Sequence, residues 1–218
     1  MDTLVEVPPE DVQSFRNYLQ RIPFRYNDVI LTVLGRHLEM EGDVRLFFDS
    51  SIVLAVWPVA LAMTPTIRAA DLVLTSEKPY NSLRPDISVL AYSGQPKPPA
   101  VAQIEIRGPQ GLAAFRSVIQ AVLNNRVIAE PMSWTLVTRQ LRKYAQATPC
   151  RAVLCSDGSD AYVFIFPPDE SEETIYFLWS WDDGSGPLTL REAVLFLIYC
   201  GIRLNAPFEL RYVYTHLR

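Results

Sequence analysis

The sequence predicts an α/β protein, and two patterns carry this prediction. Apolar residues recur at helical spacing in several segments, and short segments rich in branched residues, bounded by turn residues, lie between them. The chain has 218 residues, of which 49% are hydrophobic, so it can bury a sizeable core. Its length fits one large domain better than two small ones, and we expect a single domain over residues 1–218.

Helices are expected in both halves of the chain. Two prolines followed by two acidic residues mark the start of the first helix. Thr189 and Glu192 form a capping box at the start of the last helix, and Gly201 is expected to end it. Residues 44–63 are almost continuously apolar, which fits a buried helix or a buried strand, and we favour the helix. The predicted helices cover residues 9–21, 26–40, 44–63, 112–127, 134–146 and 189–201.

Strands are expected where short runs of branched and aromatic residues are bounded by turn residues. The proline-rich segment 93–100 joins two of these runs into a hairpin, and Ser-Asp-Gly at 156–158 joins two others. The second strand of the hairpin alternates in polarity and is expected to be half-buried. The predicted strands cover residues 72–75, 87–92, 101–107, 152–155, 162–166 and 175–181.

Composition limits the classes of function. The formal net charge of −4 argues against a protein that grips nucleic acid by general electrostatics, although a local basic face is possible around residues 139–151, opposite an acidic segment at 169–173. Three cysteines and two histidines show neither a disulfide framework nor zinc-ligand spacing. We expect Cys150, Cys155 and Cys200 to be buried, reduced thiols.

The sequence predicts an intracellular protein, in the cytoplasm or the nucleus, with no membrane partner. The most apolar run, residues 51–63, is short and contains Pro58. The first twelve residues contain acidic residues and prolines where a signal peptide has a basic start and an apolar stretch.

The predicted hairpin brings acidic and basic side chains together. Because side chains alternate along a strand, Gln103, Glu105 and Arg107 share one face. In a hairpin, the numbers of the residues that pair across the two strands have a constant sum. For a turn near residues 95–98 this sum is about 193, which places Asp86 opposite Arg107 and diagonal to Glu105. Two carboxylates on adjacent strands suit Mg²⁺, a hard cation that prefers oxygen ligands. The alternative is an ordinary exposed strand face with a Glu-Arg pair.

These residues resemble the PD-(D/E)XK motif of nucleases, with RPD at residues 84–86 and IEIR at residues 104–107. The resemblance implies a restriction-endonuclease-like core, with a mixed central sheet flanked by helices. It also implies Asp86 and Glu105 as ligands of Mg²⁺ or Mn²⁺, and hydrolysis of phosphodiester bonds. This family usually has lysine where the chain has Arg107; arginine can stabilise phosphate charge but is a poor proton acceptor.

A second motif resembles the Q-x-x-x-Y helix of RecB-like members of that family. Gln140 and Tyr144 lie four residues apart on one helix face, and the resemblance implies that they bind substrate. Lys143 could replace the missing catalytic lysine. The alternative is ordinary amphipathic packing of this helix, with a buried apolar face. That face would contain Trp134, Val137, Leu141 and Tyr144.

A weaker resemblance concerns residues 35–39, which read G-x-x-x-E and would make Glu39 a third acidic ligand; a solvated helix end is the alternative.

These motifs lead to two alternative functions. In the first, the chain is a metal-dependent nuclease of DNA or RNA, with Arg107 or Lys143 on the phosphate. In the second, it is a catalytically degenerate nuclease-fold module that binds protein or nucleic acid, similar to modules of fungal multidomain proteins. The sequence does not predict an oligomeric state.

Overall fold

A computed structural model describes most of the chain. The described residues are 3–22, 40–63, 72–76, 84–91, 100–126, 129, 131–147, 151–166, 174–181 and 183–205. Several predicted features lie outside them: the helix over 26–40 except its last residue, with Glu39, most of the hairpin loop, Cys150 and the acidic segment at 169–173.

The central element is a seven-stranded mixed sheet in the order β1-β7-β6-β5-β4-β3-β2. Its strands are β1 Thr3–Glu6, β2 Leu72–Ser76, β3 Ile87–Ala91, β4 Ala100–Ile106, β5 Ala152–Ser156, β6 Ala161–Ile165 and β7 Thr174–Ser180. The pairs β1–β7 and β4–β5 are parallel, and the other neighbours are antiparallel. The predicted α/β fold with a mixed sheet is therefore confirmed, and six of the seven strands lie where the sequence predicts them. The first strand, β1, was not predicted.

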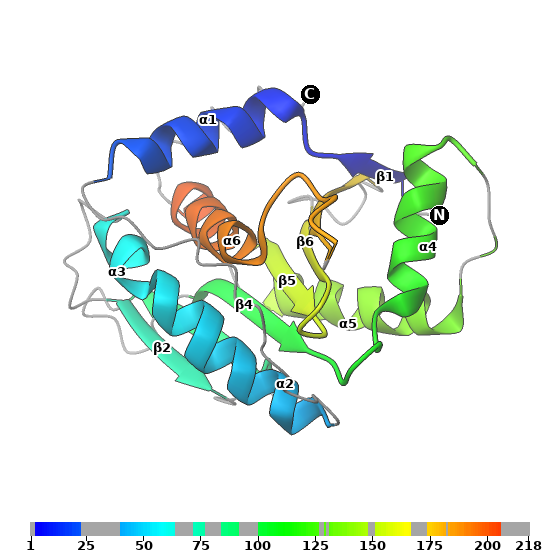
Figure 1. Cartoon of the computed structure of the whole chain (residues 1–218), viewed down its shortest axis with the longest axis horizontal. Coiled ribbons are helices and arrows are strands. Elements are labelled where there is room, and N and C mark those ends of the chain that lie inside the picture. Colours follow the sequence, from blue (N-terminus) through cyan, green and yellow to red (C-terminus); the bar gives the residue numbers. More distant parts are fainter. Residues whose placement is uncertain are drawn as a thin grey trace.

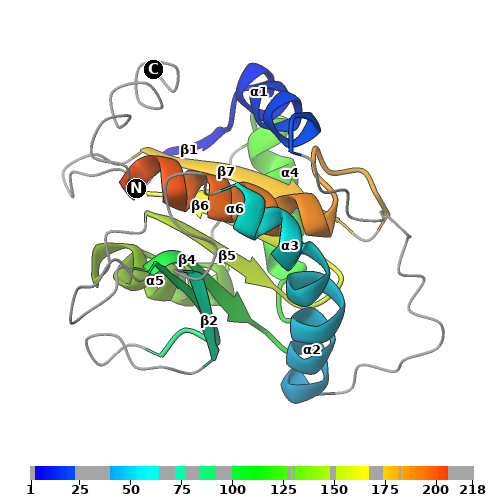
Figure 2. The ribbon, with the colours of Figure 1, turned by 90° about the vertical axis from the view of Figure 1, so that its left-hand side faces the viewer.

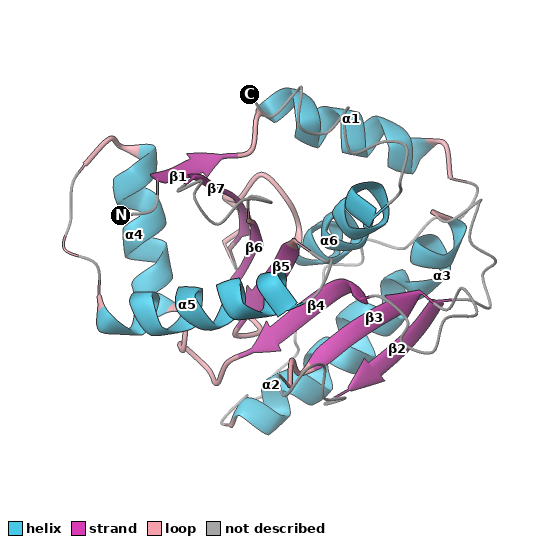
Figure 3. Ribbon diagram, turned by 180° about the vertical axis from the view of Figure 1, so that it is seen from behind, coloured by secondary structure: helices cyan, strands magenta, loops and turns pink. Residues whose placement is uncertain are grey.

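Helices cover both faces of this sheet. They are α1 Pro9–Gln20, α2 Glu41–Phe47, α3 Leu54–Ala62, α4 Ala113–Leu123, α5 Met132–Ala147 and α6 Leu190–Asn205. The face in front in Figure 1 carries α2, α3 and α6, and Figure 2 shows α6 and α3 packed side by side over the sheet. Seen from behind, α5 lies across β5 next to β4 (Figure 3). The helices predicted at these positions are confirmed.

Side-chain alternation along the strands divides most of the core into two large clusters, one on each face, beside a small third cluster of Leu90 and Ala100. On β5, Leu154 joins the cluster under α6, whereas Val153 and Cys155 join the cluster under α4 and α5. Aromatic rings dominate the second cluster, where the rings of Phe115 and Trp134 are 4.5 Å apart. Cys155 and Cys200 are buried thiols that form no disulfide, as predicted.

Two predictions about strand β4 are wrong: its burial and its register with β3. All seven of its residues are buried, not half of them, because β4 lies inside the sheet between β3 and β5, with helices on both faces. Ile87 pairs with Ile104, so paired numbers add to 191 (87 + 104), and the predicted register is wrong by two residues. A shift of two preserves the faces of the side chains. Continuing this register by one residue brings Asp86 beside Glu105 instead of Arg107.

The helix over residues 44–63 is confirmed, but Pro58 does not interrupt it. The helical segment Glu41–Ala62 is continuous through a π-helical turn at Phe48–Val53, and by length and composition it could cross a membrane. Half of its most apolar stretch is buried inside the fold, the position of a core helix. Proline removes one backbone hydrogen bond, and packing of α3 against α6 holds the helix on either side of it.

Helix α6 begins as predicted and ends later than predicted. The backbone N–H of Glu192 donates to Thr189 Oγ1 (3.2 Å) and the N–H of Thr189 to the Glu192 carboxylate (2.9 Å), which completes the capping box. Gly201 does not end the helix, which runs to Asn205. A Cβ atom at Gly201 would lie 1.4 Å from the carbonyl oxygen of Val101, so glycine is needed there for α6 to approach β4 closely.

Candidate functional site

The two predicted carboxylates lie at the same end of adjacent strands. Asp86 immediately precedes β3, and its Oδ2 accepts a hydrogen bond of 2.7 Å from the backbone N–H of Ile106 at the end of β4. Glu105 lies on β4 directly before Ile106, and its side chain is turned toward the face that α5 covers. The backbone contact at Ile106 therefore fixes Asp86 next to Glu105.

Glu105 is the centre of a buried polar network and is only 6% exposed. Its Oε1 accepts a hydrogen bond from Gln140 Nε2 (2.9 Å) and lies 3.0 Å from Arg107 Nη2. Its Oε2 accepts one from the hydroxyl of Tyr144 (2.9 Å). Arg107 Nη2 also donates to Gln140 Oε1 at 2.5 Å. The structure thus joins four predicted site residues, from α5 and from the end of β4 with the residue that follows it, in one network beside Asp86.

Burial and neighbouring charge change the acidity of this network. The pKa of Glu105 is raised to about 7, mainly by burial and then by the charges of Asp86 and, more weakly, Glu41, whereas Arg107 and the Tyr144 hydrogen bond oppose the rise. Burial also raises the pKa of Tyr144, so its hydroxyl stays a hydrogen-bond donor at neutral pH. Cys155 on β5 is the sheet neighbour of Glu105 on β4, and burial keeps the Cys155 thiol neutral by raising its pKa.

Two further charged residues come from α2 and were not predicted. Arg45 Nη1 lies 3.9 Å from Asp86 Oδ1, and its Nη2 donates to the backbone oxygen of Asp86 at 3.4 Å. Glu41 begins the helix close to the end of β4, because a Cβ atom on Gly108 would lie 3.8 Å from the Glu41 nitrogen. No local sequence pattern indicates these contacts, since they depend on how α2 docks against the sheet.

The structure does not bring Lys143 into this network. Lys143 is exposed, and it makes no hydrogen bond or ion pair with any residue in the described part of the chain. On the same helix, Trp134, Val137 and Leu141 are buried with Tyr144, so the amphipathic packing that we considered as an alternative is also present. Tyr144 serves both the apolar core and the Glu105 network.

Of the predicted basic face, only part is available to solvent. Arg139 is exposed on α5 beside Lys143. The guanidinium of Arg142 instead lies 5.6 Å from the centre of the Phe166 ring, where it covers the end of β6.

The donor set suits a hard cation only in part. Among the residues that the structure describes, no group of three or more His, Cys, Asp or Glu side chains could hold a metal ion. Asp86 and Glu105 offer two carboxylates, and Mg²⁺ is often bound by one or two carboxylates while it keeps several waters. The side-chain oxygen of Gln103, on the same face of β4, is buried without a hydrogen-bond partner. The residues therefore fit a largely hydrated ion, and the magnesium site stays a prediction.

No known protein family, curated protein or solved structure matches the chain at a significant level. We therefore infer the function of the chain from the geometry of its own residues.

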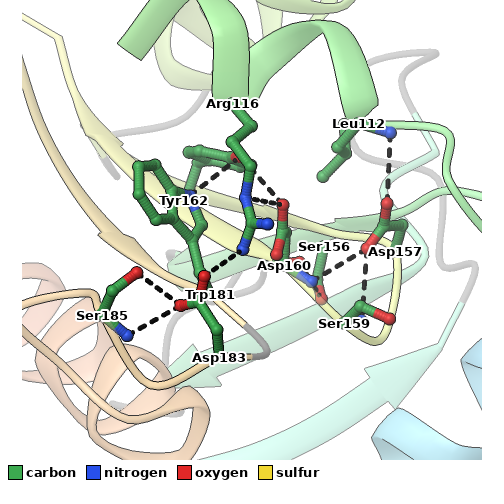
Figure 4. Close-up of polar contacts among 10 residues, drawn as sticks. All are labelled: Leu112, Arg116, Ser156, Asp157, Ser159, Asp160, Tyr162, Trp181, Asp183 and Ser185. Carbon is green, nitrogen blue, oxygen red and sulfur yellow. Dashed lines mark hydrogen bonds and ion pairs between the residues drawn. The ribbon is translucent and has the colours of Figure 1, made fainter. Parts of the chain in front are cut away.

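A second polar cluster supports the end of β4 from the side of the β5–β6 turn. The carboxylate of Asp157 accepts hydrogen bonds from the backbone N–H groups of Leu112 (3.2 Å), Ser159 (3.2 Å) and Asp160 (2.9 Å), as Figure 4 shows. The backbone oxygen of Ser156, one residue before Asp157, accepts from the N–H of Arg107 at 2.8 Å. The turn thus ties the start of α4 to the strand end that carries Glu105 and Arg107.

Arg116 of α4 completes this second cluster. Its guanidinium contacts Asp160 (3.5 Å) and Asp183 (3.3 Å) and lies 4.7 Å from the centre of the Trp181 ring. The indole N–H of Trp181 donates to the hydroxyl of Tyr162 at 3.1 Å. Sequence reasoning located the turn but missed this cluster, because its partners come from three separated segments.

Proposed function

We propose that the chain is a metal-dependent nuclease that hydrolyses phosphodiester bonds in DNA or RNA at Asp86 and Glu105. The order of elements supports this proposal. Helices α2 and α3 are followed by the antiparallel strands β2, β3 and β4, then by α4 and α5, and then by β5, which is parallel to β4. This order fits the nuclease-like core that the motif resemblance implies.

The observation that carries the proposal is the convergence of both motifs on one carboxylate. Glu105 contacts Gln140 and Tyr144 through hydrogen bonds of 2.9 Å each, and Asp86 is held beside it by the Ile106 N–H. Residues that match two separate motifs in the sequence thereby lie within one network. This placement supports the proposed resemblance.

Each residue has a defined role in this proposal. Asp86 and Glu105 hold the cation, which, when bound, activates water and stabilises charge on the phosphate. Arg107, paired with Glu105 at 3.0 Å, would meet the phosphate charge. It cannot act as a base at any working pH. Tyr144 and Gln140 orient the Glu105 carboxylate and are the substrate contacts nearest to it.

One observation favours the second function, a catalytically degenerate module. Both oxygens of Glu105 already have partners in Arg107, Gln140 and Tyr144, so the network is stable without an ion. Such a module would use another surface. The exposed large apolar residues of the described part are Met and Leu rather than aromatic residues, and they offer none of the tryptophans that are typical of a protein interface.

The experiment that tests the proposal is calorimetric titration with Mg²⁺ and Mn²⁺, together with cleavage of labelled single- and double-stranded DNA and RNA. The proteins are the wild type, Glu105→Ala and, as a matched control, Glu10→Ala, which removes an exposed carboxylate on α1. The proposal expects metal binding and cleavage in the wild type and the control, and neither in Glu105→Ala. A wild type that neither binds metal nor cuts any substrate would leave the degenerate module.

A further inference from the structure

Gln103 is a buried polar residue whose side-chain oxygen has no hydrogen-bond partner among the described residues. It is only 1% exposed. Its neighbours in the sheet are Ser88 on β3 and Val153 on β5. Glu105, two residues further along β4, has partners for both of its oxygens.

An amide at this position is costly for folding. A buried carbonyl oxygen loses its hydrogen bonds to water, and only a partner inside the protein can replace them. The rest of β4, apart from Glu105, is apolar. An apolar side chain of the same size would fill the site without this cost, so the oxygen of Gln103 calls for a partner that the described residues do not supply.

The position of Gln103 indicates which partner this is. Alternation places its side chain on the same face as Glu105, with the two Cα atoms roughly 6.6 Å apart. The Gln103 oxygen accepts no hydrogen bond from Gln140 or Tyr144, the donors that hold the Glu105 carboxylate, so it lies outside the groups in direct contact with that carboxylate. A water molecule between the ion and the amide spans this distance, and Mg²⁺ usually keeps several waters.

We propose that Gln103 is a positioning residue whose side-chain oxygen accepts a hydrogen bond from a water in the hydration shell of a divalent cation at Asp86 and Glu105. This inference rests on the proposed function. It assigns a role to an oxygen that the Glu105 network does not use. Gln103 orients the hydration shell, and Asp86 and Glu105 bind the ion.

The test compares two substitutions at this position by calorimetric titration with Mg²⁺. Gln103→Met keeps the length of the side chain and removes the oxygen, and it is expected to weaken Mg²⁺ binding by about tenfold or more. Its thermal unfolding midpoint without metal is expected to be at least that of the wild type, because a buried polar group is removed. Gln103→Glu keeps an oxygen acceptor and is expected to retain the affinity.

A matched control lies elsewhere in the same sheet. Trp179 on β7 also has a buried, unpartnered polar atom, its indole Nε1, and Trp179→Phe is expected to leave Mg²⁺ affinity unchanged. Wild-type affinity in Gln103→Met overturns this inference alone. Equal losses in Gln103→Met and Gln103→Glu also overturn it, because packing rather than the oxygen would then matter. A wild type that does not bind Mg²⁺ overturns both this inference and the metal site of the proposed function.

Discussion

The two polar clusters of this protein use the same residue types under different conditions. In the turn cluster, Asp157 accepts three backbone hydrogen bonds, and two of the donors lie within three residues of it. In the Glu105 cluster, the carboxylate is held by side chains that come from another element, and burial raises its pKa to about 7. The first arrangement stabilises the fold. The second keeps a charge where the charged form is disfavoured, which is typical of functional sites.

The largest expected effect concerns the turn cluster. Asp157→Ala removes the acceptor of three backbone N–H groups in a buried turn, and we expect a loss of about 3 kcal/mol of unfolding free energy. Urea unfolding at neutral pH measures this loss. A loss below about 0.5 kcal/mol would show that the turn does not depend on Asp157.

The next effect concerns pH and Glu105 in the metal-free protein. A carboxyl whose folded pKa is raised from 4.5 to about 7 contributes stability below its unfolded pKa, and that stability is lost as pH rises through 7. Glu105→Gln removes the ionisation, so we expect it to stabilise the protein by about 2 kcal/mol at pH 8 and by little at pH 4.

Thermal or urea unfolding across this pH range provides the measurement, with Glu10→Gln as the control at an exposed position. A gain for Glu105→Gln that is the same at pH 4 and pH 8 would contradict the assignment of a raised pKa to Glu105.

A smaller effect is expected at Tyr144. Tyr144→Phe removes the donor to Glu105 Oε2 while it keeps the ring in the apolar core. The ionised carboxylate loses a partner, so we expect a loss of about 1–2 kcal/mol at pH 8 and a smaller loss at pH 5, where Glu105 is protonated. Equal losses at both values of pH would mean that the hydroxyl stabilises the fold independently of Glu105.

The smallest effect concerns Arg116, whose contacts are partly exposed. Arg116→Met removes ion pairs with Asp160 and Asp183 and the contact with the Trp181 ring. We expect a loss of about 1 kcal/mol that decreases in high salt and is similar at pH 5 and pH 8. A strong pH dependence between these values would make the two clusters alike and remove the contrast between them.

The sequence predicted those features of the fold that depend on local pattern. Helix α1, the capping box of α6 and the hairpin strands follow from periodicity and turn residues close together in the chain. Strand β1 is four residues long and pairs with β7, about 170 residues away, and no local pattern indicates such a pairing. Gly201 was misassigned because its contact with Val101 is also between distant segments.

The candidate site also combines features that local sequence pattern predicts with features that depend on contacts between distant segments. The face shared by Glu105 and Arg107 was predictable, because alternation is independent of register and survives a shift of two residues. The contacts of Gln140 and Tyr144 followed from a motif. Arg45 and Arg116 were not predictable, since their positions depend on how helices dock on the sheet.

The central claim is that Asp86 and Glu105 together form one cation site. Calorimetric titration of Mg²⁺ into the wild type, Asp86→Ala and Glu105→Ala tests it most directly. The account predicts binding in the wild type and its loss in both variants while each stays folded by circular dichroism. Binding that persists in either folded variant would contradict a shared site, and a wild type without binding would contradict the claim as a whole.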